Sequence, residues 1–206
     1  MNRVDLTQSH DVLGAFQQEN FEEVISTFGD PGTAYALSVL SGEQQAGYLI
    51  KLAAFRHIQD LKRSLEGDHS FPFNYDLNKV SNILNFAAIC PDVDTGEPTK
   101  LMPWQAFILS QLIGWRNQDG GKRFSRAIVS VARGQGKTYM MSIIACYSYL
   151  VESLGLSNQD FLVASINYKQ TGKIYGYIKG MMKKIIANEP FRSLAAEVGL
   201  DTHSIQ

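Results

Sequence analysis

The stretch that decides the fold runs from Arg126 to Thr138 and reads Arg126-Ala127-Ile128-Val129-Ser130-Val131-Ala132-Arg133-Gly134-Gln135-Gly136-Lys137-Thr138. Its first half is apolar and rich in β-branched residues, which is typical of a buried strand. A helical pattern follows the two glycines and continues to about Leu154, where Gly155 predicts its end. A strand, a glycine-rich turn and a helix that begins at Gly-Lys-Thr are the pattern of a phosphate-binding loop.

This loop predicts a cradle for the phosphates of ATP together with Mg²⁺. Backbone N–H groups and the positive end of a helix attract phosphate oxygens, and glycine lets the backbone approach them without a Cβ. Lys137 would reach the β- and γ-phosphates, and the hydroxyl of Thr138 would hold Mg²⁺. The predicted cofactor-binding residues of the loop are Arg133, Gly134, Gln135, Gly136, Lys137 and Thr138.

Two residues of the loop depart from the usual pattern. Val131 stands where a glycine is expected, five residues before the Gly of the Gly-Lys pair. Arg133 places a fixed positive charge inside the loop, where it would stabilise charge as the γ-phosphoryl leaves, so Arg133 is the predicted catalytic residue. The alternative for Arg133 is a structural arginine that pairs with a neighbouring carboxylate. The alternative for the loop is a chance Gly-Lys-Thr in a turn, and the flanking strand and helix argue against it.

The rest of the chain predicts an α/β protein. A second buried strand is predicted at 160–165 and a helix from Tyr168 to about Asn188, so strand and helix alternate as in a parallel sheet. Upstream, apolar spacing predicts helices at about 49–67, 76–90 and 103–115. The predicted fold is a P-loop NTPase with an incomplete parallel sheet, preceded by a helical segment. We assign residues 1–100 to that segment and 101–206 to the first part of the ATPase domain.

Composition limits the class of protein but does not indicate a ligand. Hydrophobic residues make up 45% and charged residues 19% of the 206 residues, which is an ordinary globular mixture. The net charge of −1 argues neither for nor against nucleic acid as a partner. The N-terminus lacks the apolar core of a signal peptide, and the longest apolar run, about Met140–Cys146, is too short to span a membrane. These features predict a soluble protein inside a cell.

Several segments, taken in order, resemble the large terminase subunit of tailed bacteriophages, most closely the branch with HK97-like packaging. They are Leu52–Leu61, Phe71-Pro72-Phe73, Leu101–Leu109, Gly114-Trp115-Arg116 and Val131–Thr138. That family replaces the first glycine of the loop and carries an arginine inside it, so both departures become expected features.

The resemblance also implies an adenine-binding element at Trp104 and Gln105. Trp104 would pack on the base, and Gln105 would read its donor and acceptor edge. The alternative is an amphipathic core helix that contains a Trp and a Gln. A second motif is implied at Val163–Gln170, where Lys169, Gln170 and Lys173 would couple the nucleotide to DNA or to the next subunit. For Lys179, Lys183 and Lys184 a solvated helix face is the preferred interpretation.

A P-loop ATPase also needs a carboxylate at the end of another strand to hold Mg²⁺ and a second acid to activate water. No apolar run leading into Asp-Glu follows Ser165. In the family, that Walker B strand and a nuclease domain lie further along. We therefore expect weak nucleotide binding, little turnover and an exposed apolar sheet edge unless another chain covers it.

The resemblance implies a motor in the host cytoplasm that drives double-stranded DNA into a procapsid. Its implied partners are DNA, a portal protein, a small terminase subunit and further copies in a ring, with no membrane. Two alternatives stay open: a truncated, non-catalytic nucleotide-binding or interaction module, and a helicase-type ATPase.

Overall fold

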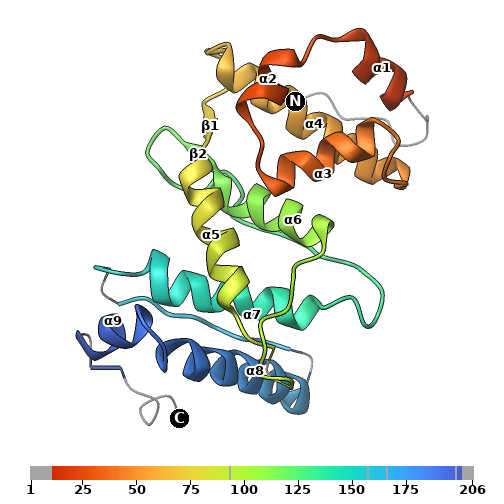
Figure 1. The fold of residues 1–206 in the computed structure, drawn as a ribbon. Coiled ribbons are helices and arrows are strands. Elements are labelled where there is room, and N and C mark those ends of the chain that lie inside the picture. Colours follow the sequence, from red (N-terminus) through yellow and green to blue (C-terminus); the bar gives the residue numbers. More distant parts are fainter. Residues whose placement is uncertain (1–10, 93, 157, 166, 198, 201–206) are drawn as a thin grey trace. The chain divides into compact units, whose positions relative to one another are not determined.

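The computed structural model describes residues 11–92, 94–156, 158–165, 167–197 and 199–200, and these are mostly helical (Figure 1). They divide into two compact units, which we describe separately. The first contains the chain up to Ser81 together with Met102–Arg126, and the second contains Asn82–Leu101 and the chain from Ala127 onward. These units do not follow the predicted division at residue 100, which stays a prediction about the sequence.

The first unit is built around α4 (Tyr48–Leu65), the predicted helix at 49–67, and around α6 (Pro103–Gly114), which begins at Pro103 as predicted. Both pack against α3 (Pro31–Leu40), and two short helices complete the set, α1 (Val12–Gln18) and α2 (Glu22–Thr27). Helix α3 begins directly after Asp30, which is its N-cap. Asp30 accepts hydrogen bonds there from the N–H groups of Gly32 and Thr33, at 3.0 and 3.1 Å.

The only sheet among the described residues belongs to the first unit. It joins β1 (Phe73–Tyr75) to β2 (Trp115–Asn117) in antiparallel register, with Tyr75 opposite Trp115. Trp115 is fully buried and its ring contacts Phe71 and Tyr75. Two three-residue strands are marginal alone, so this aromatic packing stabilises the pair.

Helix α5 (Leu77–Ile89) carries the chain from the first unit into the second. Asp76, the first residue of the helix predicted at 76–90, caps α5, because its Oδ1 accepts hydrogen bonds from the N–H groups of Asn78 and Lys79 at 2.9 and 3.1 Å. Val80, Ile83 and Ala87 of this helix are fully buried.

The second unit contains α7 (Lys137–Tyr147), a π-helical turn η1 (Ser148–Glu152), α8 (Tyr168–Ile186) and α9 (Phe191–Glu197). Helices α7 and α8 correspond to the two long helices predicted after the glycine loop, and they lie side by side (Figure 1). Met140 and Ile143 of α7 and Met181 and Ile185 of α8 are buried. The second unit is therefore held mainly by helix–helix packing.

The two strands predicted at 126–131 and 160–165 are not present as strands, and the predicted parallel sheet is not seen in the described chain. Both segments are irregular and lack a ladder partner. Each segment leaves one large apolar side chain almost fully exposed, Ile128 at 97% and Leu162 at 92%. A run of β-branched residues becomes a strand only when a neighbouring strand supplies hydrogen bonds, and no described segment supplies them.

Gly114 ends α6 at a point where no side chain fits. A Cβ there would lie 2.5 Å from Cγ2 of Val80 and 2.7 Å from Cε2 of Tyr75. We expect Gly114→Ala to lower the free energy of unfolding by about 1–3 kcal/mol, because the added methyl group overpacks the core. Both tryptophans, Trp104 and Trp115, lie in the first unit, so tryptophan fluorescence during urea denaturation reports on it.

The matched control is Gly29→Ala, since Gly29 belongs to the same unit and has open space where its Cβ would be. We expect this variant to stay within about 0.5 kcal/mol of the unaltered chain. Equal denaturation midpoints for the two variants would contradict the close contact at Gly114.

His57 is the centre of a buried polar chain in the first unit. Its Nδ1 accepts from the amide of Gln111 at 2.9 Å, and its Nε2 lies 3.1 Å from the hydroxyl of Thr33, which donates to Asp30. Gln111 in turn accepts from Nε1 of Trp115 at 3.2 Å. This chain is complete only with neutral imidazole, because protonation of Nδ1 would set two donors against each other.

Burial, with smaller contributions from Arg56 and Arg123, lowers the pKa of His57 to about 3. Below about pH 6.5 the imidazole of His57 therefore becomes protonated in the unfolded chain while it stays neutral in the folded chain. The contribution of this group to stability is full above that pH and is lost as the pH falls. We expect the free energy of unfolding to fall by about 2 kcal/mol between pH 6.5 and pH 5 from this group. His57→Gln should remove that part of the slope, and an unchanged slope in the variant would contradict the assignment.

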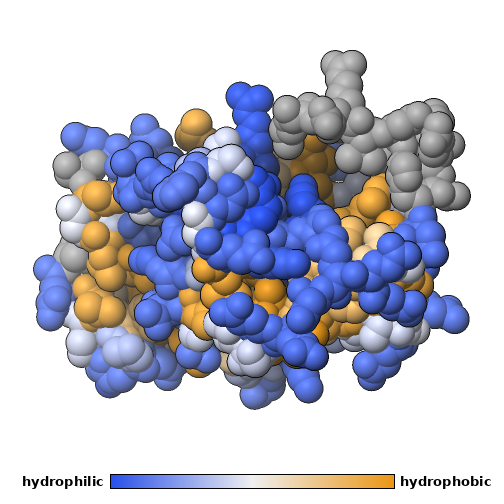
Figure 2. Space-filling model, turned by 90° about the horizontal axis from the view of Figure 1, so that it is seen from above, coloured by the Kyte–Doolittle hydropathy of each residue, from blue (hydrophilic) through white to orange (hydrophobic). Residues whose placement is uncertain are grey.

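No helix in the described part of the chain combines the length and apolar character needed to cross a bilayer. Figure 2 shows one face of the molecule on which apolar residues gather in separate patches among hydrophilic ones.

Candidate functional site: the phosphate loop of the second unit

The glycine loop adopts a conformation that only glycine takes without strain. Gly134 and Gly136 have φ values of +83° and +68°, both in the left-handed region. Gly136 is the residue before α7, and no side chain caps the helix there. The first turn of α7 therefore presents its unpaired N–H groups and its positive end without a competing side-chain acceptor.

Lys137 is the first residue of α7, and its side chain turns back over the loop. Its Nζ donates to the carbonyl oxygens of Val131 and Ala132 at 2.6 and 2.8 Å. The amine thus holds the residues before the turn close to the helix start. A phosphate bound at this turn would accept an ionic hydrogen bond from the same amine.

Thr138 and Arg133 are both exposed. Among the described residues neither the Thr138 hydroxyl nor the Arg133 guanidinium has a hydrogen bond or an ion pair, so the carboxylate partner considered for Arg133 is not observed there. The backbone carbonyl of Thr138 accepts from Ser142 at 2.8 Å, which fixes the first turn. Both side chains can therefore turn toward a ligand.

Trp104 and Gln105 lie at the start of α6 in the first unit. Gln105 is 4% exposed, and its Oε1 accepts the backbone N–H of Met102 at 2.9 Å, so it caps the helix that contains it. Trp104 is half-buried, with Nε1 3.3 Å from the sulfur of Met102. Their role in binding adenine stays a prediction.

The start of α8 is capped by residues of the second predicted motif. Asn167 accepts the N–H of Gln170 at 2.9 Å, and the hydroxyl of Ser165 donates to the Gln170 side chain at 2.9 Å. Lys169 and Lys173 are exposed. This motif thus shapes a helix start, and its coupling to DNA or to a second subunit stays a prediction.

The 90–99 loop, of which Val93 lies outside the described residues, makes contacts in this unit that the sequence did not predict. The hydroxyl of Tyr139 donates to the carbonyl of Cys90 at 2.7 Å and lies 3.3 Å from that of Thr99. The hydroxyl of Tyr177 donates to the carboxylate of Asp92 at 2.6 Å. The only sequence signal was an acidic turn rich in Pro and Gly, which does not indicate its partners.

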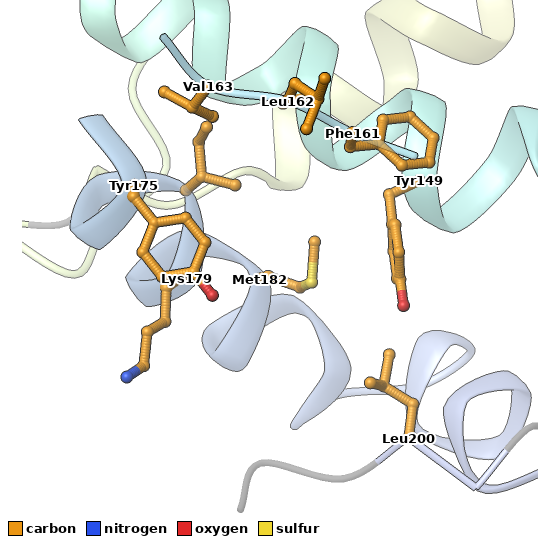
Figure 3. Close-up of a pocket in the computed structure, with 10 residues that line it drawn as sticks. Tyr149, Phe161, Leu162, Val163, Tyr175, Lys179, Met182 and Leu200 are labelled. Atoms are coloured by element: carbon orange, nitrogen blue, oxygen red, sulfur yellow. The ribbon is translucent and has the colours of Figure 1, made fainter. Parts of the chain in front are cut away.

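An apolar pocket of about 350 Å³ also lies in the second unit (Figure 3). Tyr175, Lys179 and Met182 of α8 line one side, and Phe161, Leu162 and Val163 line another. Lys179 is its only charged lining residue, and the Lys179 amine points away from the pocket (Figure 3). This lining does not suit a phosphate, so the glycine loop remains the candidate phosphate site.

The cysteines and acidic residues do not form a second centre in the described part of the chain. Cys90 and Cys146 are buried free thiols whose pKa values are raised by burial, as expected for structural cysteines. No group of three or more His, Cys, Asp or Glu side chains is placed to hold a metal among the described residues.

Comparison with known proteins identifies the family to which part of the chain is similar. Residues 103–204 match the family described as the terminase large subunit, ATPase domain. The match includes α6, the glycine loop, α7 and α8, which are the elements that carry the predicted site residues. No curated protein and no solved structure gives a significant match to the chain. By this match over residues 103–204, the chain belongs to the terminase large subunit family and carries sequence of its ATPase domain.

Proposed function

We propose that this chain is the ATP-binding part of a viral DNA-packaging motor. Such a motor couples ATP hydrolysis to the translocation of double-stranded DNA into a procapsid. The observation that carries the proposal is the start of α7: a left-handed Gly136 without a side-chain cap, followed by Lys137 and Thr138, within the matched ATPase segment. The HK97-like branch, the portal protein, the small terminase subunit and a ring of copies are parts of the same proposal.

The residues of the loop fit ATP and Mg²⁺ in their chemistry. Uncapped N–H groups at the first turn of α7 suit phosphate oxygens, and Lys137 adds a positive charge at the same turn. The exposed hydroxyl of Thr138 is the predicted Mg²⁺ ligand, and Arg133 is the predicted stabiliser of charge on the transferred phosphoryl group. Gln105 and Trp104 are the proposed contacts to adenine.

The chain offers these residues without an acidic pair of the kind a P-loop ATPase uses. The dipeptide Asp-Glu occurs nowhere in its 206 residues. Hydrolysis needs a carboxylate to order Mg²⁺ and an acid or amide to orient water. We therefore propose that this chain, as given, binds ATP and turns it over slowly.

The test is an ATP titration of the purified chain by calorimetry, with Mg²⁺ and with EDTA. We expect Mg²⁺ to strengthen ATP binding, and Thr138→Val to remove most of that strengthening, because the variant keeps the shape of threonine and loses the hydroxyl. Ser148→Ala is the matched control, since it removes a hydroxyl on η1 that donates to Glu152. Absence of ATP binding, with or without Mg²⁺, would refute the proposed function.

The second candidate is a non-catalytic nucleotide-binding or interaction module of a terminase. Steady-state ATP hydrolysis, measured with and without double-stranded DNA, separates the two candidates, because only the motor predicts turnover that DNA stimulates.

A further inference from the structure

The 90–99 loop meets the phosphate-binding helix at one residue, Tyr139. Tyr139 directly follows Thr138 and is the third residue of α7, so it belongs to the turn whose N–H groups would face the phosphates. Its side chain is 7% exposed. Burial raises its pKa, so the hydroxyl is a neutral donor near pH 7. It lies 2.7 Å from the carbonyl of Cys90 and 3.3 Å from that of Thr99, and it therefore contacts both ends of the loop.

The loop has a closed backbone of its own. Pro91 and Pro98 form an antiparallel bridge, the N–H of Asp92 donates to Glu97 at 2.9 Å, and the N–H of Gly96 donates to Asp92 at 2.8 Å. Gly96 has a φ of +82°, which the turn requires. These bonds make the loop one hydrogen-bonded unit, so a contact made at one end of the loop also restrains the residues at its other end.

Asp92 joins this loop to α8. One carboxylate oxygen accepts the N–H groups of Asp94 and Thr95 at 2.9 and 3.1 Å, and the other accepts the hydroxyl of Tyr177 at 2.6 Å. The bond from Tyr177 is the main cause that lowers the pKa of Asp92, with the backbone bonds adding to it. The carboxylate is therefore charged at neutral pH, and it accepts hydrogen bonds from the loop and from α8 at the same time.

We propose that Tyr139 and the Asp92–Tyr177 pair are positioning residues that hold the first turn of α7 in its phosphate-binding conformation. The loop is tied at its neck to α7 and at Asp92 to α8, so the first turn of α7 is anchored through α8 as well as through its own helix. Removing either tyrosine hydroxyl loosens the turn before ATP arrives, and ATP must then order it on binding. This inference rests on the proposed ATP-binding function of the same loop.

The experiment compares ATP affinity in Tyr139→Phe, Tyr177→Phe and the control Tyr149→Phe, under conditions where circular dichroism shows each chain to be folded. Each change removes one hydroxyl and keeps the ring. The Tyr149 hydroxyl has no hydrogen-bond partner among the described residues. We expect the dissociation constant for ATP to rise about 3- to 10-fold in Tyr139→Phe, the size of one net hydrogen bond, and about 2- to 3-fold in Tyr177→Phe. Tyr149→Phe should bind as the unaltered chain does.

Tyr177→Phe is the decisive variant because its hydroxyl lies on α8 and not on the phosphate-binding turn. Hydrogen exchange of the α7 amides that carry intrahelical bonds, beginning with the N–H of Met140, which donates to the carbonyl of Gly136 at 3.0 Å, should be faster without ATP in both Tyr139→Phe and Tyr177→Phe. A lower denaturation midpoint with unchanged ATP affinity in both variants would show a structural role only and overturn the inference. If the unaltered chain does not bind ATP, both the proposed function and this inference fail. If the unaltered chain binds ATP and both variants bind it equally tightly, only this inference fails.

Discussion

Replacement of Lys137 by alanine is expected to weaken ATP binding about 100-fold or more. The Nζ of Lys137 is the predicted ionic donor to the β- and γ-phosphates, and hydrogen bonds to charged groups contribute about 1.5–3 kcal/mol each. The same amine now donates to the carbonyls of Val131 and Ala132. The variant therefore loses a phosphate contact and a contact that holds the loop closed, and both losses act against binding.

Calorimetric titration with Mg²⁺ and ATP measures the effect, and Lys79→Ala is the control. Lys79 is an exposed lysine on α5, so its replacement removes the same charge from the chain without touching the glycine loop. We expect ATP affinity to be unchanged in the control. Binding by Lys137→Ala within threefold of the unaltered chain would show that the glycine loop is not the phosphate site.

Replacement of Arg123 by alanine is expected to lower the free energy of unfolding of the first unit by about 3 kcal/mol. Arg123 donates from Nη1 to Oδ2 of Asp60 at 2.8 Å, and the two side chains are only 14% and 8% exposed. Its guanidinium also lies 4.9 Å from the ring of Phe71 and 5.0 Å from that of Trp115. The variant leaves a buried carboxylate whose nearest remaining ion-pair partner, Arg63, is 4.0 Å away, with Arg56 as a further positive charge nearby, and it removes the cation–π contacts.

Urea denaturation followed by tryptophan fluorescence measures this effect, since both tryptophans belong to the first unit. Lys62→Ala is the control in the same unit, because it breaks a more exposed pair with Glu19 at 3.7 Å. That pair should contribute less than about 1 kcal/mol. Replacing both Asp60 and Arg123, as in Asp60→Leu with Arg123→Met, should recover much of the loss, and no recovery would argue against an unpaired carboxylate as its cause.

The sequence predicted the longer helices, α4 to α8, because their signals are local, and it did not predict α1, α2, α3 or α9. Apolar spacing placed α4, α5 and α8, Asp76 marked a helix start, and Pro103 marked another. The glycine loop was predicted for the same reason, since a left-handed backbone at Gly134 and Gly136 is a requirement of the loop itself.

The features that were missed depend on residues far apart in the chain. The pairing of Tyr75 with Trp115 and the bond between Asp92 and Tyr177 join segments that local periodicity cannot relate. The predicted strands failed for a related reason. An apolar run such as 126–131 reports a tendency to be buried, whereas a strand also needs a partner that the run itself does not specify.

The order of the two units along the chain has a practical consequence for anyone who shortens this protein. The chain passes from one unit to the other after Ser81, after Leu101 and after Arg126, so no single cut separates them. A fragment that begins at residue 103, where the family match begins, would carry α6 without α3 and α7 without the 90–99 loop. A shortened chain intended to bind ATP should therefore keep both α3 and the 90–99 loop, and so should begin before Pro31.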